Sequence, residues 1–137
     1  MKTTINTTAA GLINISSEYL GNKASQWSDK NNQNYNNHVV KVIHNKKSFS
    51  FEFWGSMMNP EISNDQENVF AFYCALSDGI SSRDSFENFC GEFGYDEDSR
   101  TAERIYKACE KTLKKVERVF SCDLYDLINE IADTYNC

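Results

Sequence analysis

Residues 84–106 read DSFENFCGEFGYDEDSRTAERIY, and this stretch joins a short amphipathic segment to a long one through a tight acidic turn. Four apolar residues of the first segment recur at helical spacing and define one face of a helix: Phe86, Phe89, Cys90 and Phe93. Ser85 is placed to cap this helix, and Gly94 supplies the left-handed residue that ends it. We expect the rest of the chain to pack around this aromatic face.

Three further helices are predicted on either side of this stretch. Asn64 and Glu67 form a capping box that begins a helix, and a glycine signal at residues 78–79 ends it. A long helix over residues 99–120 follows the acidic turn, with Asp98 or Ser99 placed to cap it, and Asp123 is placed to cap a last helix. All of them carry apolar residues at intervals of three and four, which is typical of helices that pack on a core.

A β-hairpin precedes the helices. Residues 38–43 are rich in valine and isoleucine, residues 45–47 favour a turn, and residues 49–53 alternate with period two. The alternation places Phe49, Phe51 and Phe53 on one face of the second strand. A hairpin alone is marginally stable in water, so helices must cover it or a third strand must join it.

The fold class predicted from these elements is α+β, with a β-hairpin of two to three antiparallel strands packed against about four helices. Residues 37–137 form a single domain of this class. Residues 1–36 have no clear pattern and are expected to pack on the core as a poorly defined N-terminal segment. Within them, residues 9–20 are compatible with an irregular helix, and the segment is also the source of any third strand.

Composition excludes several functional classes. The chain has 137 residues and a net charge of −6, with no apolar run long enough to cross a membrane and no secretory signal. The five cysteines include no CxxC pair, which favours buried small side chains in a reducing cytoplasm over a metal site.

Catalytic patterns are also missing. His38 and His44 lie six residues apart on one strand, which we interpret as a feature of the strand surface. Cys90 lies in mid-helix among phenylalanines, and the Asp96–Asp98 triplet lacks the glycine and glutamate that a calcium loop needs. We therefore expect no enzyme activity, no cofactor and no metal.

Charge is distributed in blocks along the chain. Residues 61–98 hold ten acids and one base, whereas residues 103–118 hold six bases and three acids. The acidic block predicts a partner-binding surface, for which we select five residues: Glu87, Glu92, Asp96, Glu97 and Asp98. The basic helix offers an alternative nucleic-acid-binding face: Arg104, Lys107, Lys111, Lys114 and Arg118. Glutamates every seven residues along that helix favour a solvated, salt-bridged surface instead.

The run from Ser85 to Arg100, continuing to Ile105, Tyr106 and Cys109, resembles a motif of the form SFExFCxEFGYDxDSR in small uncharacterised proteins of bacteriophages and prophages. The resemblance covers about residues 38–120. It implies an accessory protein of a mobile element that acts in the host cytoplasm. It transfers no functional residue, because no activity is established for that group as a whole. Short acidic proteins from this context often inhibit host defence nucleases, including CRISPR effectors.

The leading hypothesis is a non-enzymatic inhibitor of a host nucleic-acid-handling complex. Its acidic side chains would mimic phosphates and occupy a basic channel of the target protein. The alternative is a nucleic-acid-binding regulatory module that uses the basic face of helix 99–120, although an acidic protein repels nucleic acid at long range. A structural protein that self-assembles is a third possibility.

Overall fold

The computed structural model describes residues 2–21, 36–55 and 64–135. Within these ranges, four strands precede four helices: β1 (Lys2–Thr7), β2 (Gly11–Gly21), β3 (Asn36–His44), β4 (Lys47–Gly55), α1 (Asp65–Ser81), α2 (Phe86–Phe93), α3 (Arg100–Val119) and α4 (Leu124–Tyr135). The class is α+β, as predicted. The predicted count of two to three strands is wrong, because residues 2–21 supply two more strands to the hairpin.

The strands form one antiparallel sheet in the order β1-β2-β3-β4. The predicted hairpin is formed by β3 and β4, and Asn45 and Lys46 between them have φ angles of 48° and 66°. Positive φ at both central residues gives a turn whose twist matches that of the flanking strands. Across the sheet, Ile15 lies opposite Val42.

Residues 9–20 do not form the irregular helix that was considered. They belong to the β1–β2 turn and to β2. Buried and exposed residues alternate along the whole of β1, as in a strand with one face on the core. The turn is fastened by Thr7, whose hydroxyl accepts a hydrogen bond from the Ala10 amide at 3.0 Å and donates to the Gly11 carbonyl at 3.0 Å.

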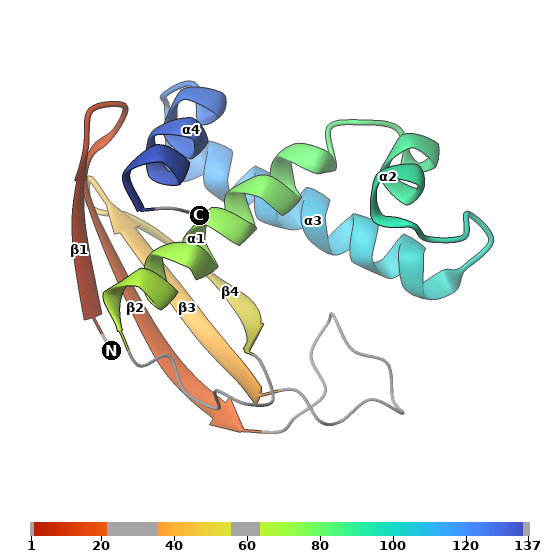
Figure 1. The fold of residues 1–137 in the computed structure, drawn as a ribbon, viewed down its shortest axis with the longest axis horizontal. Coiled ribbons are helices and arrows are strands. Elements are labelled where there is room, and N and C mark those ends of the chain that lie inside the picture. The colour runs from red at the N-terminus through yellow and green to blue at the C-terminus, as the bar shows by residue number, and fades with distance from the viewer. Residues whose placement is uncertain (1, 22–35, 56–63, 136–137) are drawn as a thin grey trace.

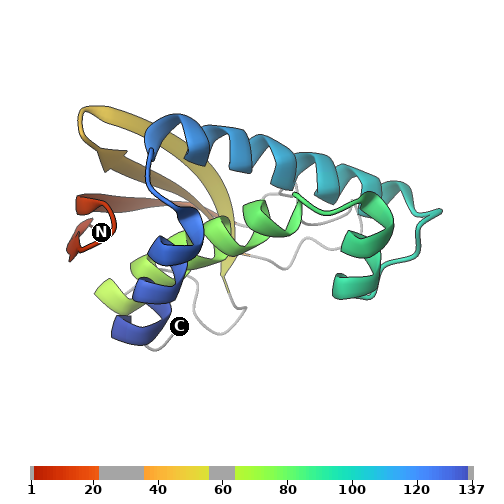
Figure 2. The same ribbon diagram turned by 90° about the horizontal axis from the view of Figure 1, so that it is seen from above.

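Three helices, α1, α3 and α4, lie over the same face of the sheet (Figure 1, and Figure 2 from above). Between sheet and helices is the main core, which contains Val40 and Val42 of β3, Phe72 and Leu76 of α1, Val116 of α3, and Leu127 and Ile131 of α4. Phe49 and Phe51 of β4 are buried in it as predicted, and Phe53 is half-buried beside them. The core is therefore built around the sheet.

α1 runs past the glycine that was expected to end it. Gly79 is buried inside the helix, which continues to Ser81. A β-carbon at this position would lie 3.3 Å from the Cα atom of Leu113 in α3. The glycine thus allows α1 and α3 to approach closely, and the helix ends at Ser82, whose amide bonds back to the carbonyls of the last turn.

α2 stands apart from the main core. It projects beyond the sheet and packs on the N-terminal half of α3 (Figure 1). Phe89, Ile105 and Cys109 form a separate small buried cluster there, against which Tyr106 packs. The expectation that the rest of the chain is arranged around the aromatic face of α2 is therefore wrong, because the main core lies elsewhere and, among the described elements, the buried cluster on that face is formed with α3.

Candidate functional site

The acidic residues selected from the sequence lie on a projecting lobe, which we call the acidic lobe and define as residues 84–99. Its local structure follows from its caps. The Ser85 hydroxyl accepts a hydrogen bond from the Asn88 amide at 3.2 Å, and Gly94 ends α2 with a φ angle of 73°. Ser99 then caps α3 by accepting from the Ala102 amide at 3.3 Å. The two helices are thus joined by a turn of four residues between Gly94 and Ser99. Gly94 was predicted, and Ser99 is the one of the two predicted caps, Asp98 or Ser99, that the structure uses.

All five predicted acidic residues are exposed on this lobe. Glu87 and Glu92 extend from α2, and Asp96, Glu97 and Asp98 occupy the turn. Asp96 accepts a hydrogen bond from the Asp98 amide at 3.0 Å, which orders the turn. No basic residue occurs between residues 84 and 99. The lobe is therefore a uniformly acidic projection.

Two aromatic rings are exposed among these carboxylates. Phe93 and Tyr95 retain 39% and 38% of their surface, and their rings stack with centroids 6.1 Å apart and planes 17° from parallel. Phe93 was assigned to the buried face of α2, and it does contact Phe89, at 4.7 Å between centroids. Its outer side is nevertheless open. Exposed aromatic residues are enriched at the centres of protein interfaces, so this pair adds a second binding element to the charge.

Tyr95 was not selected from the sequence. The signal was present, because an aromatic residue follows the C-terminal glycine of α2 and precedes three acids. Its amide donates to the Cys90 carbonyl at 2.8 Å, which is part of the helix-ending motif and fixes the position of its ring. Burial, and then the neighbouring Cys109 and Asp78, raise the pKa of its phenol.

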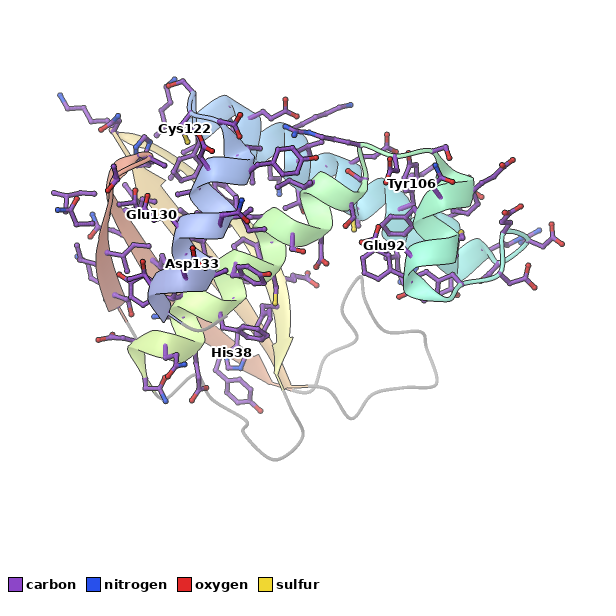
Figure 3. All side chains as sticks on the ribbon, turned by 45° about the horizontal axis from the view of Figure 1, so that its top comes forward. His38, Glu92, Tyr106, Cys122, Glu130 and Asp133 are labelled. Atoms are coloured by element: carbon purple, nitrogen blue, oxygen red, sulfur yellow. The ribbon has the colours of Figure 1, made fainter. Side chains whose placement is uncertain are left out.

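The carboxylates of the lobe also raise the pKa values of titratable groups that lie close to them. Asp78 of α1 is half-buried, and burial and then Glu92 raise the pKa of its carboxyl from 3.8 to about 6. Glu92 lies on the side of α2 that faces α1 (Figure 3), where it accepts a hydrogen bond from the Ser81 hydroxyl at 3.2 Å. Burial, and then Glu97 and Asp96, raise the pKa of the Cys90 thiol. The Cys90 thiol is thus kept in its unreactive protonated form.

The alternative basic residues lie along α3, and all five are exposed. The structure divides them by their partners. Arg118 donates to the Ser48 carbonyl of β4 at 3.3 Å, beside Lys115, which donates to the Ser50 carbonyl at 3.0 Å. These two side chains cover the outer edge of β4. Lys107 forms an ion pair with Glu103 at 2.9 Å, as the glutamate spacing predicted, and this pair raises the pKa of Lys107 and lowers that of Glu103.

The two histidines are buried, which corrects their interpretation as strand-surface residues. The His44 ring places Nε2 2.6 Å from the Ala10 carbonyl and Nδ1 3.3 Å from the Val119 carbonyl, and it stacks on Phe120. His38 lies beside Tyr19 near the other end of β3 (Figure 3). Their partners are structural, and among residues 2–21, 36–55 and 64–135 no three histidine, cysteine or acidic side chains come together as a metal site.

The prediction that the cysteines are buried small side chains is confirmed in part. Cys90 and Cys109 are buried, and Cys74 and Cys122 are half-buried. Burial, and then Asp78, raise the pKa of Cys109 to about 12. Cys137 lies outside the described residues.

A pocket of about 400 Å³ lies at the opposite end of the molecule from the lobe, where β1 meets the start of α1 and the end of α4. Its polar wall is formed by Thr3, which donates to the Asp65 carboxylate at 2.7 Å, and by Gln66, which donates to the Tyr135 carbonyl at 3.3 Å. The Thr3 hydroxyl also accepts a hydrogen bond from the Asn68 side chain at 3.0 Å, so the polar groups of this wall join β1 to α1.

No protein-family model matches the chain, and no curated protein or solved structure matches it either. No helix in the described part of the chain has the length and apolar character needed to cross a membrane. The site must therefore be interpreted from its own geometry.

Proposed function

We propose that the protein is a non-enzymatic binding protein whose acidic lobe docks on a basic surface of another protein. The observation that carries this proposal is the combination of five exposed carboxylates with the stacked, exposed rings of Phe93 and Tyr95 on one projection. Carboxylates supply attraction and orientation, while the rings supply the apolar contact that charge alone does not give.

The chemistry of the lobe fits a partner rich in arginine and lysine. Arginine side chains pair with carboxylates and also stack on aromatic rings, so one guanidinium group can use both features of the lobe. Surfaces with this composition are those that bind the phosphates of nucleic acids. The partner class we propose is thus a nucleic-acid-handling protein, and occupation of its basic channel would inhibit it. A host defence complex of the CRISPR type is the target that the resemblance to phage proteins implies.

The proposal is tested by affinity capture from a bacterial lysate at low salt, with and without nuclease. The matched bait replaces the five acids by their amides: Glu87→Gln, Glu92→Gln, Asp96→Asn, Glu97→Gln and Asp98→Asn. These changes remove charge and keep side-chain volume. We expect a nuclease-resistant, basic partner that the wild-type bait retains, that the neutralised bait loses, and that duplex DNA displaces in competition.

A variant with Phe93→Ser and Tyr95→Ser separates the two features of the lobe. It keeps every carboxylate, so it should still meet the partner quickly but release it faster. Binding that survives in both variants would exclude the lobe as the docking surface. Partners that disappear on nuclease treatment would instead favour the basic face of α3.

A further inference from the structure

The exposed face of α3 carries a row of cations, which we call the basic stripe and define as Arg100, Arg104, Lys107, Lys111 and Lys114. Their spacing of four, three, four and three residues keeps them on one side of the helix, over a length of roughly 21 Å. All five are exposed. The opposite side of α3 is buried, through Ile105, Cys109 and Val116.

The lysines of the basic stripe are accessible to a binding partner. Its ion pair between Lys107 and Glu103 is highly exposed, with 68% and 55% of the two side chains accessible. Exposed pairs of this kind contribute little and exchange readily with other partners. Lys115 and Arg118, which lie beside the stripe, are directed to the edge of β4 and leave the stripe itself facing solvent.

The acidic lobe and the basic stripe have complementary charge but fixed positions in one molecule. The lobe is joined to the N-terminal end of α3 through Ser99, and α3 is one continuous helix to Val119. The lobe therefore lies alongside the N-terminal half of α3, and the C-terminal half of the helix continues past it (Figure 1). Arg100 directly follows the lobe in the chain, whereas the cations farther along α3 can meet a full set of lobe carboxylates only on a second copy.

We propose that the basic stripe binds the acidic lobe of a second copy of this chain, so that copies associate head to tail. Each copy has one lobe and one stripe, and the contact joins different surfaces, so it extends into a ring or an open chain rather than stopping at a symmetric dimer. The net charge of −6 on each copy opposes association. The contact is consequently weak, concentration-dependent and sensitive to salt.

This inference rests on the acidic lobe of the proposed function and adds a regulatory consequence. A lobe that is engaged by a neighbouring copy is not available to a foreign partner, so self-association and partner binding compete. Dilution or a high-affinity partner would release the lobe. The stripe can be removed without touching the lobe, which allows the two hypotheses to be tested separately.

The experiment is sedimentation velocity on the full chain over a wide concentration range, in low salt (about 25 mM NaCl) and in about 300 mM NaCl. A lobe-reversed variant carries Glu87→Lys, Glu97→Lys and Asp98→Lys, and a stripe-reversed variant carries Lys107→Glu, Lys111→Glu and Lys114→Glu. We expect the wild type to associate in low salt and to dissociate in high salt. Each variant alone should associate at least about tenfold more weakly, because like charges then face each other.

Mixing the two variants gives the decisive result. The acidic lobe of one variant again meets a basic stripe of the other, and the reversed surfaces also match, so equimolar mixing should restore association. The matched control carries Lys2→Glu, Lys41→Glu and Lys46→Glu, which change the net charge equally at exposed residues outside the stripe. Unlike the stripe-reversed variant, it should still associate in low salt. Circular dichroism melts verify that each variant is folded.

Three outcomes would overturn the proposal. They are a wild type that stays monomeric at the highest concentration, association that both variants keep, and a mixture that fails to recover. A stripe-reversed variant that instead loses affinity for a short duplex, measured by fluorescence anisotropy, would assign the stripe to nucleic acid. The stripe-reversed variant keeps its acidic lobe and should still capture a foreign partner, so failure of self-association is distinguishable from failure of the proposed function.

Discussion

The body of the molecule, formed by the sheet with α1, α3 and α4, and the acidic lobe are held together by different means. In the body, eighteen buried residues form one apolar cluster between sheet and helices. Between α2 and α3, the buried cluster in the described part of the chain has three residues, with Tyr106 packed against it. The lobe combines carboxylates, with no basic residue among them, and the exposed rings of Phe93 and Tyr95, whereas the exposed aromatic side chains of the body, such as Phe70 and Tyr125, lie over a large buried core. Stability is thus concentrated in one region and binding capacity in the other.

Polar contacts follow the same division. In the body, the Glu130 carboxylate accepts hydrogen bonds from the Thr8 and Ala9 amides at 2.7 and 2.9 Å and ties α4 to the β1–β2 turn (Figure 3). His44 ties that turn to the end of α3. In the lobe, long-range bonds are the Tyr106 hydroxyl to the Asp84 carbonyl at 2.7 Å and Ser81 to Glu92. The lobe is therefore easier to detach than any part of the body.

The largest expected effect is in the core of the body. Phe72 of α1 is fully buried and packs against Phe120, at 5.7 Å between ring centroids. Phe72→Ala should lower the free energy of unfolding by about 3–5 kcal/mol, because it leaves a cavity that the sheet cannot fill. Urea denaturation measures this. Phe70→Ala on the same helix, where the ring is 45% exposed, is the control and should cost much less.

The equivalent change in the lobe sharpens the comparison. Phe89 is as fully buried as Phe72, but its cluster is small. Phe89→Ala should remove hydrogen-exchange protection from the α2 amides while the strands of the body keep theirs. Loss of protection throughout the sheet in this variant would show that lobe and body unfold as one unit.

The sequence predicted those elements whose determinants are local. The caps Asn64 and Ser85 and the left-handed Gly94 each act within about one helical turn, so spacing alone located them, and it narrowed the cap of α3 to Asp98 or Ser99. The β3–β4 hairpin was found for the same reason, since its turn has two residues. The acidic lobe was predicted as a charged turn between two helices, and the structure places it there.

What the sequence did not predict is only partly explained by contacts between distant residues. β1 and β2 form a local hairpin, so the alternation in residues 2–16 was a signal that went unrecognised, whereas the pairing of β2 with β3 joins segments far apart in the chain. His44 is buried by the carbonyls of Ala10 and Val119, which lie 34 and 75 residues away. Helical spacing placed Phe93 on the apolar face of α2 but could not show that, among the described elements, this face forms its buried cluster with α3. The outward position of Phe93 beside Tyr95 follows from that.

Asp78 lies where body and lobe meet, and its titration gives the next largest effect. Its pKa is raised in the folded state from 3.8 to about 6, so the folded protein binds more protons than the unfolded chain between these two values. The free energy of unfolding therefore falls as pH rises through this window and stays lower above it. Asp78→Asn should be more stable than the wild type by roughly 3 kcal/mol at pH 7, and the difference should fall below about 1 kcal/mol near pH 4.

Urea denaturation at several pH values tests this prediction. Asp84→Asn, at an exposed carboxylate nearby in the chain, is the matched control. A variant at Asp78 that shows the same pH dependence as the wild type would mean that another group dominates the titration.

A smaller effect is expected where the body is tied by a polar contact. Glu130→Gln leaves one acceptor oxygen for two amides, so the Thr8 or the Ala9 amide loses its charge-assisted partner. We expect a loss of about 1 kcal/mol and faster hydrogen exchange in the β1–β2 turn. Asp133→Asn, an exposed carboxylate on the same helix, should leave both unchanged. If Glu130→Gln leaves hydrogen exchange in the β1–β2 turn unchanged, Glu130 does not hold the turn to α4.

The smallest effect tests how closely the lobe approaches the body. Glu92 is the second cause of the raised pKa of Asp78, after burial. Glu92→Gln should therefore lower the pKa of Asp78 but leave it above 3.8, because burial persists when the neighbouring charge is removed. Glu87→Gln, on the same helix, provides the comparison, since burial and Glu92 alone account for the shift. Titration followed by carboxyl carbon NMR measures both variants. If Glu92→Gln and Glu87→Gln behave alike, the lobe does not rest on α1, and its attachment reduces to the small cluster on α3.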